Sequence, residues 1–467
     1  MTPKEQHGMD MTKGHIGQQL WKFSIPMLLG STFQTAYSIV NALWVGNGLG
    51  KDAVGAIAVS FPVIFFLMAI AGGLTMATSV LVSQAYGAKN YDRMNQVIQN
   101  SLVLILISSA ILLVMGYITV EPLLKLMKTP PEILPMATQY IKLFIWVVPF
   151  MFVMILITSI LRGVGDSMTP LYFQAAGVVI TGLLDPFLMF GWCGLPRLGL
   201  NGTAWATLIC NAMGVIALDW YLHYKKHIAT PNWRKMKADW ETTWLTLKLG
   251  IPPMLQQALV SMGFLIMMGL VNEYGHNATA AFGIVMRIDQ LAFIPSMTIG
   301  MAVSTLAGQN VGANRYDRVP SVFRWGILYG VGLTAIVSLL CFTIPHFLLK
   351  FFVKDVTVVQ LGESYLRVMG WGYLLFAVIF VSNGIINGAG HTLATTFFTL
   401  IGLWIIRLPL ATWASHQYHQ LHYIWYAMVF STLIGTLMSC AYYYLGWWKK
   451  PIGKTKLVPP AETQPVD

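Results

Sequence analysis

A lone aspartate lies inside an apolar run of this chain, in the stretch VITGLLDPFLMFG from Val179 to Gly191. At bilayer depth a carboxylate such as Asp185 costs roughly 2.5–3.5 kcal/mol even on forgiving insertion scales, so an ionisable residue there is by default a candidate functional site. A carboxylate in this position can bind a cation or carry a proton. Asp185 therefore needs a structural setting that explains it.

Polar side chains at helical spacing form three stripes in the N-terminal half. Unsatisfied polar groups are costly in hydrocarbon, so we expect the stripes to meet in one chamber. Carboxylate, amide and hydroxyl oxygens suit an alkali cation, whereas a desolvated carboxylate can instead carry a proton, and the spacing does not choose between them. The stripes are Gln34, Tyr37 and Asn41; Thr181 and Asp185; and Thr203 and Thr207.

A second pair of charges, Arg287 and Asp289, lies in the run GIVMRIDQLAFIP of the C-terminal half. Residues two apart do not face each other on a helix, so each needs a partner elsewhere or contact with water. Asp289 could meet a cationic substrate or a second proton, or both residues could make structural contacts. We expect both near a substrate cavity.

Residues can lie at bilayer depth only in a membrane protein, and the composition indicates one. The chain has 467 residues, of which 56% are hydrophobic and only 10% charged, too few polar residues for a soluble globule of this size. A transmembrane helix needs roughly 20 apolar residues. We expect an all-α integral membrane protein with about twelve helices, near 19–46, 53–84, 94–119, 133–161, 170–190, 201–223, 246–271, 278–308, 319–345, 358–386, 394–414 and 422–446.

The chain contains an internal duplication. MATSVLVSQAYGAKNYDR at 76–93 matches MAVSTLAGQNVGANRYDR at 301–318 at a shift of 225 residues, and LRGVGD at 161–166 matches INGAGH at 386–391 at the same shift. Six helices per half is an even number, so the halves should be related by a pseudo-two-fold axis along the membrane normal. The glycine of the GA in each first block is expected to permit a tight reversal between helices.

The duplication also supplies an internal control. At the shift of 225 residues Asp185 maps to Leu410, and Thr181 maps to Ile406. The C-terminal copy therefore forms the same kind of helix without the acid. This favours a functional role for Asp185 over a structural one.

The charge distribution and the duplication indicate how the chain lies in the membrane and how it divides into parts. The net charge of +11 comes from basic residues gathered in loops on one side. This indicates cytoplasmic termini in a plasma (inner) membrane rather than binding to nucleic acid. One chain can build the whole cavity, so we expect a functional monomer in the lipid bilayer. The expected parts are an N-terminal tail at 1–18, a lobe at 19–223, a cytoplasmic connector at 224–245, a second lobe at 246–446 and a C-terminal tail at 447–467.

In the order of these motifs the chain resembles the multidrug and toxic compound extrusion (MATE) transporters over residues 15–446. The shared features are two six-helix halves, an early IP in the first helix of each, GQ..GA after the second, LRG.GD after the fourth and DP in the fifth. The resemblance implies an antiporter, not an enzyme, that needs no cofactor. It would expel small organic, often cationic, molecules while Na+ or H+ flows inward.

The family branch resembling DNA-damage-inducible protein F implies a cation site in the N-terminal half. That resemblance places its tyrosine at Tyr37, its fifth-helix acid at Asp185 and its sixth-helix hydroxyl at Thr203. Asn41 stands where the branch has an acid, and Thr181 where it has an asparagine. With one carboxylate instead of two, we expect a single monovalent ion or proton per transport cycle.

Pro26 in the first helix is a candidate hinge, because proline can let a transmembrane helix bend or straighten. A static kink is the alternative. Replacing Pro26 by alanine separates the two, since only a moving hinge is needed for transport.

Two other functions, a lipid-linked sugar flippase and a membrane-embedded transferase, fit the sequence less well. A lipid-linked sugar flippase of similar fold would need a strongly cationic central cavity, but the basic residues lie mainly in the loops. A membrane-embedded transferase would need clustered acids for a metal, or a His/Asp pair at bilayer depth, and the sequence shows neither pattern.

Overall fold

The computed structural model describes residues 8–127, 129–194, 196–353 and 355–450, without the side chains of Asn47 and Lys51. Residues 1–7 of the expected N-terminal tail and 451–467 of the expected C-terminal tail lie outside the described residues.

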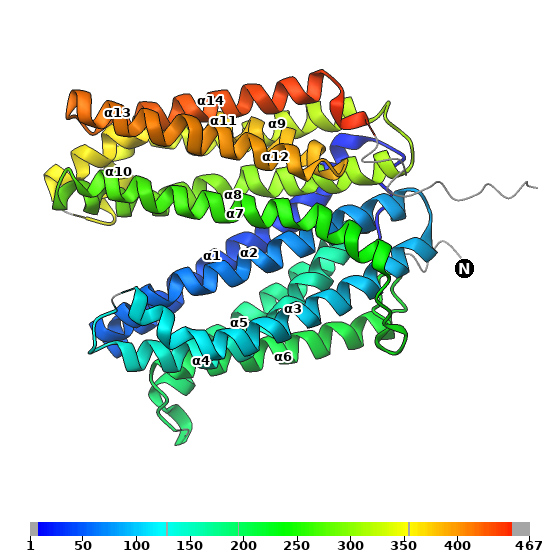
Figure 1. The fold of residues 1–467 in the computed structure, drawn as a ribbon, viewed down its shortest axis with the longest axis horizontal. Helices are drawn as coiled ribbons and strands as arrows, with labels where there is room; N and C mark the ends of the chain where they lie inside the picture. The colour runs from blue at the N-terminus through cyan, green and yellow to red at the C-terminus, as the bar shows by residue number, and fades with distance from the viewer. Residues whose placement is uncertain (1–7, 128, 195, 354, 451–467) are drawn as a thin grey trace, which may run out of the picture. The chain divides into compact units, whose positions relative to one another are not determined.

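The described chain consists of long helices, as the apolar runs predict (Figure 1). Among the described residues, eleven helices are long and apolar enough to cross a membrane. A further helix, α1, with 34 residues, corresponds to the first predicted span. The N-terminal half contains α1 (Ile16–Leu49), α2 (Lys51–Gly87), α3 (Tyr91–Leu126), α4 (Leu134–Gly163), α5 (Met168–Phe190), η2 (Trp192–Gly194) and α6 (Leu200–Tyr224).

The second set of helices follows the short η3 (Trp233–Lys235) in the predicted connector. The predicted eleventh span is a single run, Thr392–Tyr418, whose middle is a π-helix. The elements are α7 (Trp240–Asn272), α8 (His276–Gly312), α9 (Val319–Thr343), α10 (Pro345–Lys350), α11 (Val356–Gly388), α12 (Thr392–Thr399), η4 (Leu400–Arg407), α13 (Leu408–Tyr418), α14 (His422–Tyr444) and η5 (Trp447–Lys449).

The helices form two compact units. Of the described residues, unit 1 contains Leu29–Val82, Tyr91–Gly250 and residues 8–9. Unit 2 contains Asp10–Leu28, Ser83–Asn90 and the described residues from 251 to 450. The start of α1 and the end of α2 belong to unit 2, whereas the rest of both helices belongs to unit 1.

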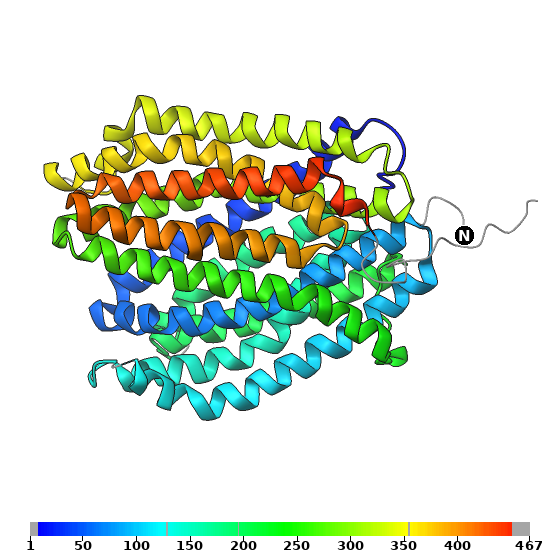
Figure 2. The same cartoon turned by 45° about the horizontal axis from the view of Figure 1, so that its top comes forward.

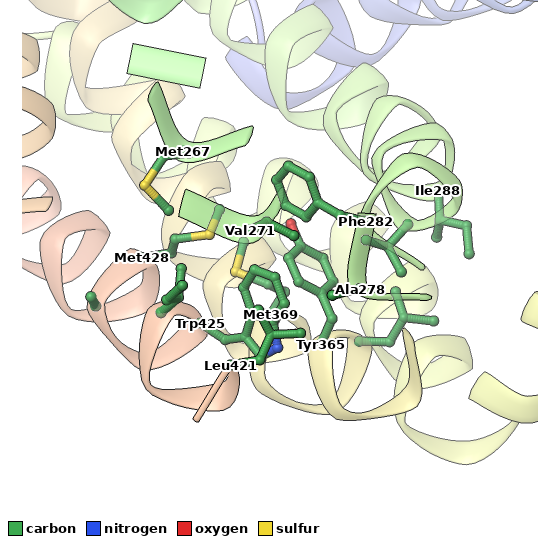
Figure 3. Packing of buried hydrophobic residues seen from close by; sticks show 14 of the residues in the cluster. Met267, Val271, Ala278, Phe282, Ile288, Tyr365, Met369, Leu421, Trp425 and Met428 are labelled. Atoms are coloured by element: carbon green, nitrogen blue, oxygen red, sulfur yellow. The ribbon is translucent and has the colours of Figure 1, made fainter. Parts of the chain in front are cut away.

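Each unit has its own apolar core. In unit 1, α4 packs against α3 and α6, around buried side chains that include Ile141 and Phe144. In unit 2, α11 packs against α8, α9 and α14, and both views show these helices side by side (Figures 1 and 2). Phe282, Tyr365 and Trp425 lie together in this second core (Figure 3).

The two copies of the repeated glycine motif meet within unit 2, where α2 and α8 end. A Cβ atom on Gly87 would lie 2.0 Å from the carbonyl oxygen of Gln309, and one on Gly312 would lie 2.0 Å from that of Gln84. Backbones can approach this closely only where no side chain stands between them. The duplicated motif therefore makes a reciprocal helix contact.

The expectation that these glycines form the chain reversal is wrong. The left-handed residues are Lys89, with φ 56°, and Asn314, with φ 57°. Both lie two positions beyond the glycines, which are the last residues of α2 and α8. The reversal and the close approach are thus separate functions of neighbouring residues.

Candidate cation site in unit 1

Two of the three polar residues predicted on α1, Tyr37 and Asn41, meet the aspartate of α5. Asp185 is 0% exposed, and its Oδ2 accepts hydrogen bonds from the Tyr37 hydroxyl at 3.0 Å and from Asn41 Nδ2 at 2.9 Å. The two donors are one turn apart on α1, so one helix face supplies both. Oδ2 is therefore held by two fixed donors within unit 1.

The other carboxylate oxygen of Asp185, Oδ1, does not share these hydrogen bonds. Oδ1 of Asp185 is buried and has no hydrogen-bond partner among the described residues. No described Lys, Arg or His side chain forms an ion pair with this carboxylate, either. A buried acceptor without a partner is costly, so Oδ1 is a position where a cation or a proton fits.

The predicted threonines lie beside Asp185 but do not bond to it. The Thr181 hydroxyl donates to the Gly177 carbonyl oxygen at 2.7 Å, and the Thr203 hydroxyl donates to that of Leu200 at 2.9 Å. Both side chains are buried. Bonds of this kind, back to the preceding turn, are common for threonine in helices, so the two hydroxyls would have to turn to reach an ion at Asp185.

Two residues that the sequence did not indicate complete the surroundings of Asp185. Tyr140 of α4 and Cys210 of α6 both lie close enough to interact electrostatically with the carboxylate. Cys210 lies one turn after Thr207 on the polar stripe of α6, so the helical spacing could have found it. Tyr140 is a single residue on an otherwise apolar face of α4, so only the packing of α4 against α6 reveals it.

The start of α5 is anchored outside its apolar run. Asp166 Oδ1 accepts from the backbone N–H groups of Met168 and Thr169, both at 3.0 Å, and Asp166 Oδ2 lies 3.6 Å from His227 Nε2 in the connector. Burial alone would raise the pKa of Asp166, but the nearby His227 ring and the hydrogen bonds from Thr169 outweigh it and lower the pKa. This contact fixes the helix that carries Asp185.

Asp289 of unit 2 lies in a closed polar cluster. It is 2% exposed and accepts hydrogen bonds from two α11 tyrosines: Tyr365 donates to Oδ2, and Tyr373 donates to Oδ1 at 2.5 Å. Arg287 is exposed and does not share this cluster. The expectation that the two charges do not face each other is thus confirmed.

The remaining predicted residues lie on α1. Gln34 is exposed, one turn from Tyr37, and is not brought to the carboxylate. Pro26 is buried inside α1. The helix passes from unit 2 to unit 1 between Leu28 and Leu29, two residues after this proline.

A further charge, that of a half-buried arginine, lies within a membrane-spanning run. Arg407 ends the π-helix near the middle of the Thr392–Tyr418 run. Its guanidinium donates to the hydroxyls of Ser431 at 2.7 Å and Thr432 at 2.9 Å. These bonds hold α14 against the irregular segment.

Comparison with known proteins gives the family. The MatE family model matches the chain twice, over residues 26–187 and 252–413, so the predicted duplication is confirmed. The "Probable multidrug resistance protein YoeA" of Bacillus subtilis (strain 168) is 32% identical over 452 residues, which cover 96% of this chain and 97% of that protein. The "FAD transporter" of Shewanella oneidensis is 25% identical over 420 residues, covering 88% and 91%.

Solved structures share the fold. A chain described as an outward-facing conformation of a multidrug resistance MATE family transporter has a TM-score of 0.88 at 20% identity, covering 95% of this chain and 99% of that one. A MOP superfamily transporter from Pyrococcus furiosus gives a TM-score of 0.89, with the same identity and coverage. At this identity the likeness concerns the fold alone.

Proposed function

We propose a function from one premise: the chain belongs to the MATE family of multidrug and toxic compound extrusion transporters and is a multi-pass membrane protein. Its function is multidrug efflux by secondary antiport. The cargo consists of small organic, often cationic, molecules, and the driving ion is Na+ or H+. Relatives named as multidrug resistance proteins support this cargo class.

The observation that carries the proposal is the state of the two Asp185 oxygens. Oδ2 is saturated by Tyr37 and Asn41, whereas Oδ1 is buried without a partner. A carboxylate that is fixed by one oxygen and open at the other can bind a monovalent ion or a proton without rearranging its own side chain. We place the coupling ion at Oδ1.

The hydroxyls of Thr181 and Thr203 would complete the ion site. Each is buried and one side-chain rotation away from its present backbone bond. Together with Asp185 they offer carboxylate and hydroxyl oxygens, which suit an alkali cation. For a proton, the carboxylate alone suffices.

The cargo surface includes Gln34, Arg287 and Asp289. Gln34 and Arg287 are exposed within apolar helices, and such groups are costly against lipid, so we place them against a water-filled cavity. Asp289 is closed off by Tyr365 and Tyr373, so a cation reaches it only after a tyrosine moves.

Pro26 is the proposed hinge. A proline removes one backbone hydrogen bond and lets a helix bend. Its position two residues before α1 passes from unit 2 to unit 1 supports this role. Movement there would couple the segment carrying Tyr37 and Asn41 to the transport cycle.

The protein is proposed to lie in the plasma (inner) membrane, with both termini in the cytoplasm, and to work as a monomer. Basic loop residues on one side support the orientation, and the two copies of the fold in one chain support the monomer. The relatives do not favour a lipid-linked sugar flippase or a membrane-embedded transferase.

The test is uptake of a fluorescent organic cation into inside-out proteoliposomes under an imposed sodium gradient and then an imposed pH gradient. The proposal predicts accumulation driven by one of the two gradients. Uptake that ignores both gradients would contradict antiport.

A further inference from the structure

The part of the connector that links α6 to α7 in unit 1 concentrates positive charge (Figure 1). Residues 225–237 contain five Lys and Arg residues and no Asp or Glu. All five side chains are exposed, and none forms an ion pair with a described residue. They make up the connector surface: Lys225, Lys226, Arg234, Lys235 and Lys237.

Two acids beside the connector surface are engaged in contacts within the protein. Asp219, near the end of α6, accepts a hydrogen bond from the indole Nε1 of Trp233 at 2.9 Å. Asp239 accepts from the backbone N–H and the hydroxyl of Thr242, at 2.8 and 2.6 Å, and so caps the start of α7. With Glu241 included, five basic residues against three acidic ones leave the segment 219–241 positive.

The connector is folded against unit 1 and does not extend freely into solvent. His227 is 4% exposed, and the Thr230 hydroxyl donates to the Leu222 carbonyl oxygen of α6 at 3.1 Å. The far end is held to α3, because Asn100 Oδ1 accepts from the backbone N–H of Asp239 at 3.1 Å. A surface that is already ordered loses little conformational entropy when it binds a partner.

Exposed aromatic pairs flank the connector at the ends of two membrane spans. Trp220 and Tyr224 lie one turn apart at the end of α6, and their rings stack with centres 5.5 Å apart. Trp240 and Trp244 lie one turn apart at the start of α7, and all four side chains are exposed. Tryptophan and tyrosine are enriched at the level of lipid headgroups. The connector surface therefore lies at the depth of the lipid phosphates.

We propose that the connector surface binds anionic phospholipids of the adjacent leaflet. Each basic residue near an anionic lipid surface strengthens binding roughly fivefold. The five cations attract the negative headgroup, and the aromatic pairs contact the lipid just below it. The rule that gathers basic loops on one side of a membrane requires positive charge alone. It requires neither the ordered connector nor the aromatic pairs.

This lipid site is separate from the proposed export function, because it needs neither Asp185 nor an ion gradient. Bound lipid would also stabilise the connector around His227, which lies 3.6 Å from Asp166 before the start of α5. Occupancy of the connector surface would thus steady the helix that carries Asp185 without contact with the ion site.

The test is native mass spectrometry of the full-length protein in a neutral detergent. The protein is titrated with phosphatidylglycerol or with phosphatidylcholine of identical acyl chains. The wild type should bind the first phosphatidylglycerol at least about tenfold more tightly than the first phosphatidylcholine. A connector variant should bind the two lipids within about twofold of each other. It combines Lys225→Gln, Lys226→Gln, Lys235→Gln and Lys237→Gln.

A control variant removes the same charge from exposed lysines outside the connector, and it should keep the preference for phosphatidylglycerol. It combines Lys13→Gln, Lys22→Gln, Lys350→Gln and Lys450→Gln. Thermal unfolding checks that both variants are folded. Excess glycerol 3-phosphate should not displace phosphatidylglycerol, because it lacks the acyl chains.

Three results would overturn the proposal. The first is a wild type without the preference, or a connector variant that keeps it. The second is an equal loss in the control variant, which would make the preference an effect of total charge. The third is displacement by glycerol 3-phosphate, which would assign the connector surface to a soluble phosphate compound.

Discussion

The Tyr37 hydroxyl lies 3.0 Å from Asp185 Oδ2, although the residues are 148 positions apart in the chain. Together with Asn41 it stabilises the ionised, ion-free carboxylate. Charge-assisted hydrogen bonds of this kind contribute roughly 1.5–3 kcal/mol. If Asp185 is the coupling site, as proposed, this contact sets how tightly it holds the ion.

Tyr37→Phe should make the coupling ion bind more tightly and leave more slowly, because the ion-free state loses a donor. We expect half-maximal transport at about tenfold lower ion concentration, with a lower maximal rate. The measurement is transport rate against ion concentration in proteoliposomes. Tyr117→Phe, on an exposed part of α3, is the control, and weaker ion binding in Tyr37→Phe would show instead that the phenol oxygen is an ion ligand.

The single carboxylate predicts the stoichiometry. Asn41 adds no charge to Asp185, so one monovalent ion or proton should cross per transport cycle. The reversal potential of transport in proteoliposomes with known cargo and ion gradients measures this ratio. A ratio of two or more would exclude Asp185 as the sole coupling group.

Gly312→Ala should prevent correct packing of the α2 and α8 ends. The new Cβ would lie 2.0 Å from the carbonyl oxygen of Gln84, and a backbone atom cannot move aside cheaply. We expect loss of folded protein or a strongly lowered unfolding temperature. Gly332→Ala is the matched control, because a Cβ there meets nothing within 4 Å; equal stability of the two variants would contradict the reciprocal contact.

Asp166 should make stability depend on acid. Its pKa in the folded protein is below the ordinary value of 3.8, so its interactions stabilise the protein above that pH and are lost as pH falls through the folded value. Asp166→Asn keeps an oxygen for the two backbone N–H groups but loses the negative charge at the helix N-terminus, so it should lower stability at neutral pH by roughly 0.3–1 kcal/mol and weaken the acid dependence. Thermal unfolding in detergent at several pH values measures both effects. If acid lowers the unfolding temperature of Asp166→Asn as steeply as that of the wild type, Asp166 is not the source of the acid dependence.

Much of the fold follows from the sequence because apolar runs of membrane length must form helices. The first and fifth helices were placed within a few residues, and the meeting of Tyr37, Asn41 and Asp185 followed from the cost of isolated polar groups in hydrocarbon. The helix bounds agree with the first prediction. The hydrogen bonds from Tyr37 and Asn41 to Asp185 agree with the second.

Other contacts depend on how helices are aligned, which periodicity does not encode. Tyr365 and Tyr373 reach Asp289 only because α11 packs beside α8 at one particular register. The hydroxyls of Thr181 and Thr203 bond to their own helices, an alternative that spacing cannot distinguish from bonding across the chamber.

The central claim is tested most directly by Asp185→Asn in inside-out proteoliposomes, with Glu121→Gln, an exposed acid paired with Lys125, as the control. The wild type and the control should accumulate a fluorescent organic cation under a sodium or a pH gradient. Asp185→Asn should respond to neither gradient. Full gradient-driven transport by Asp185→Asn would contradict the account and leave Asp185 a structural contact.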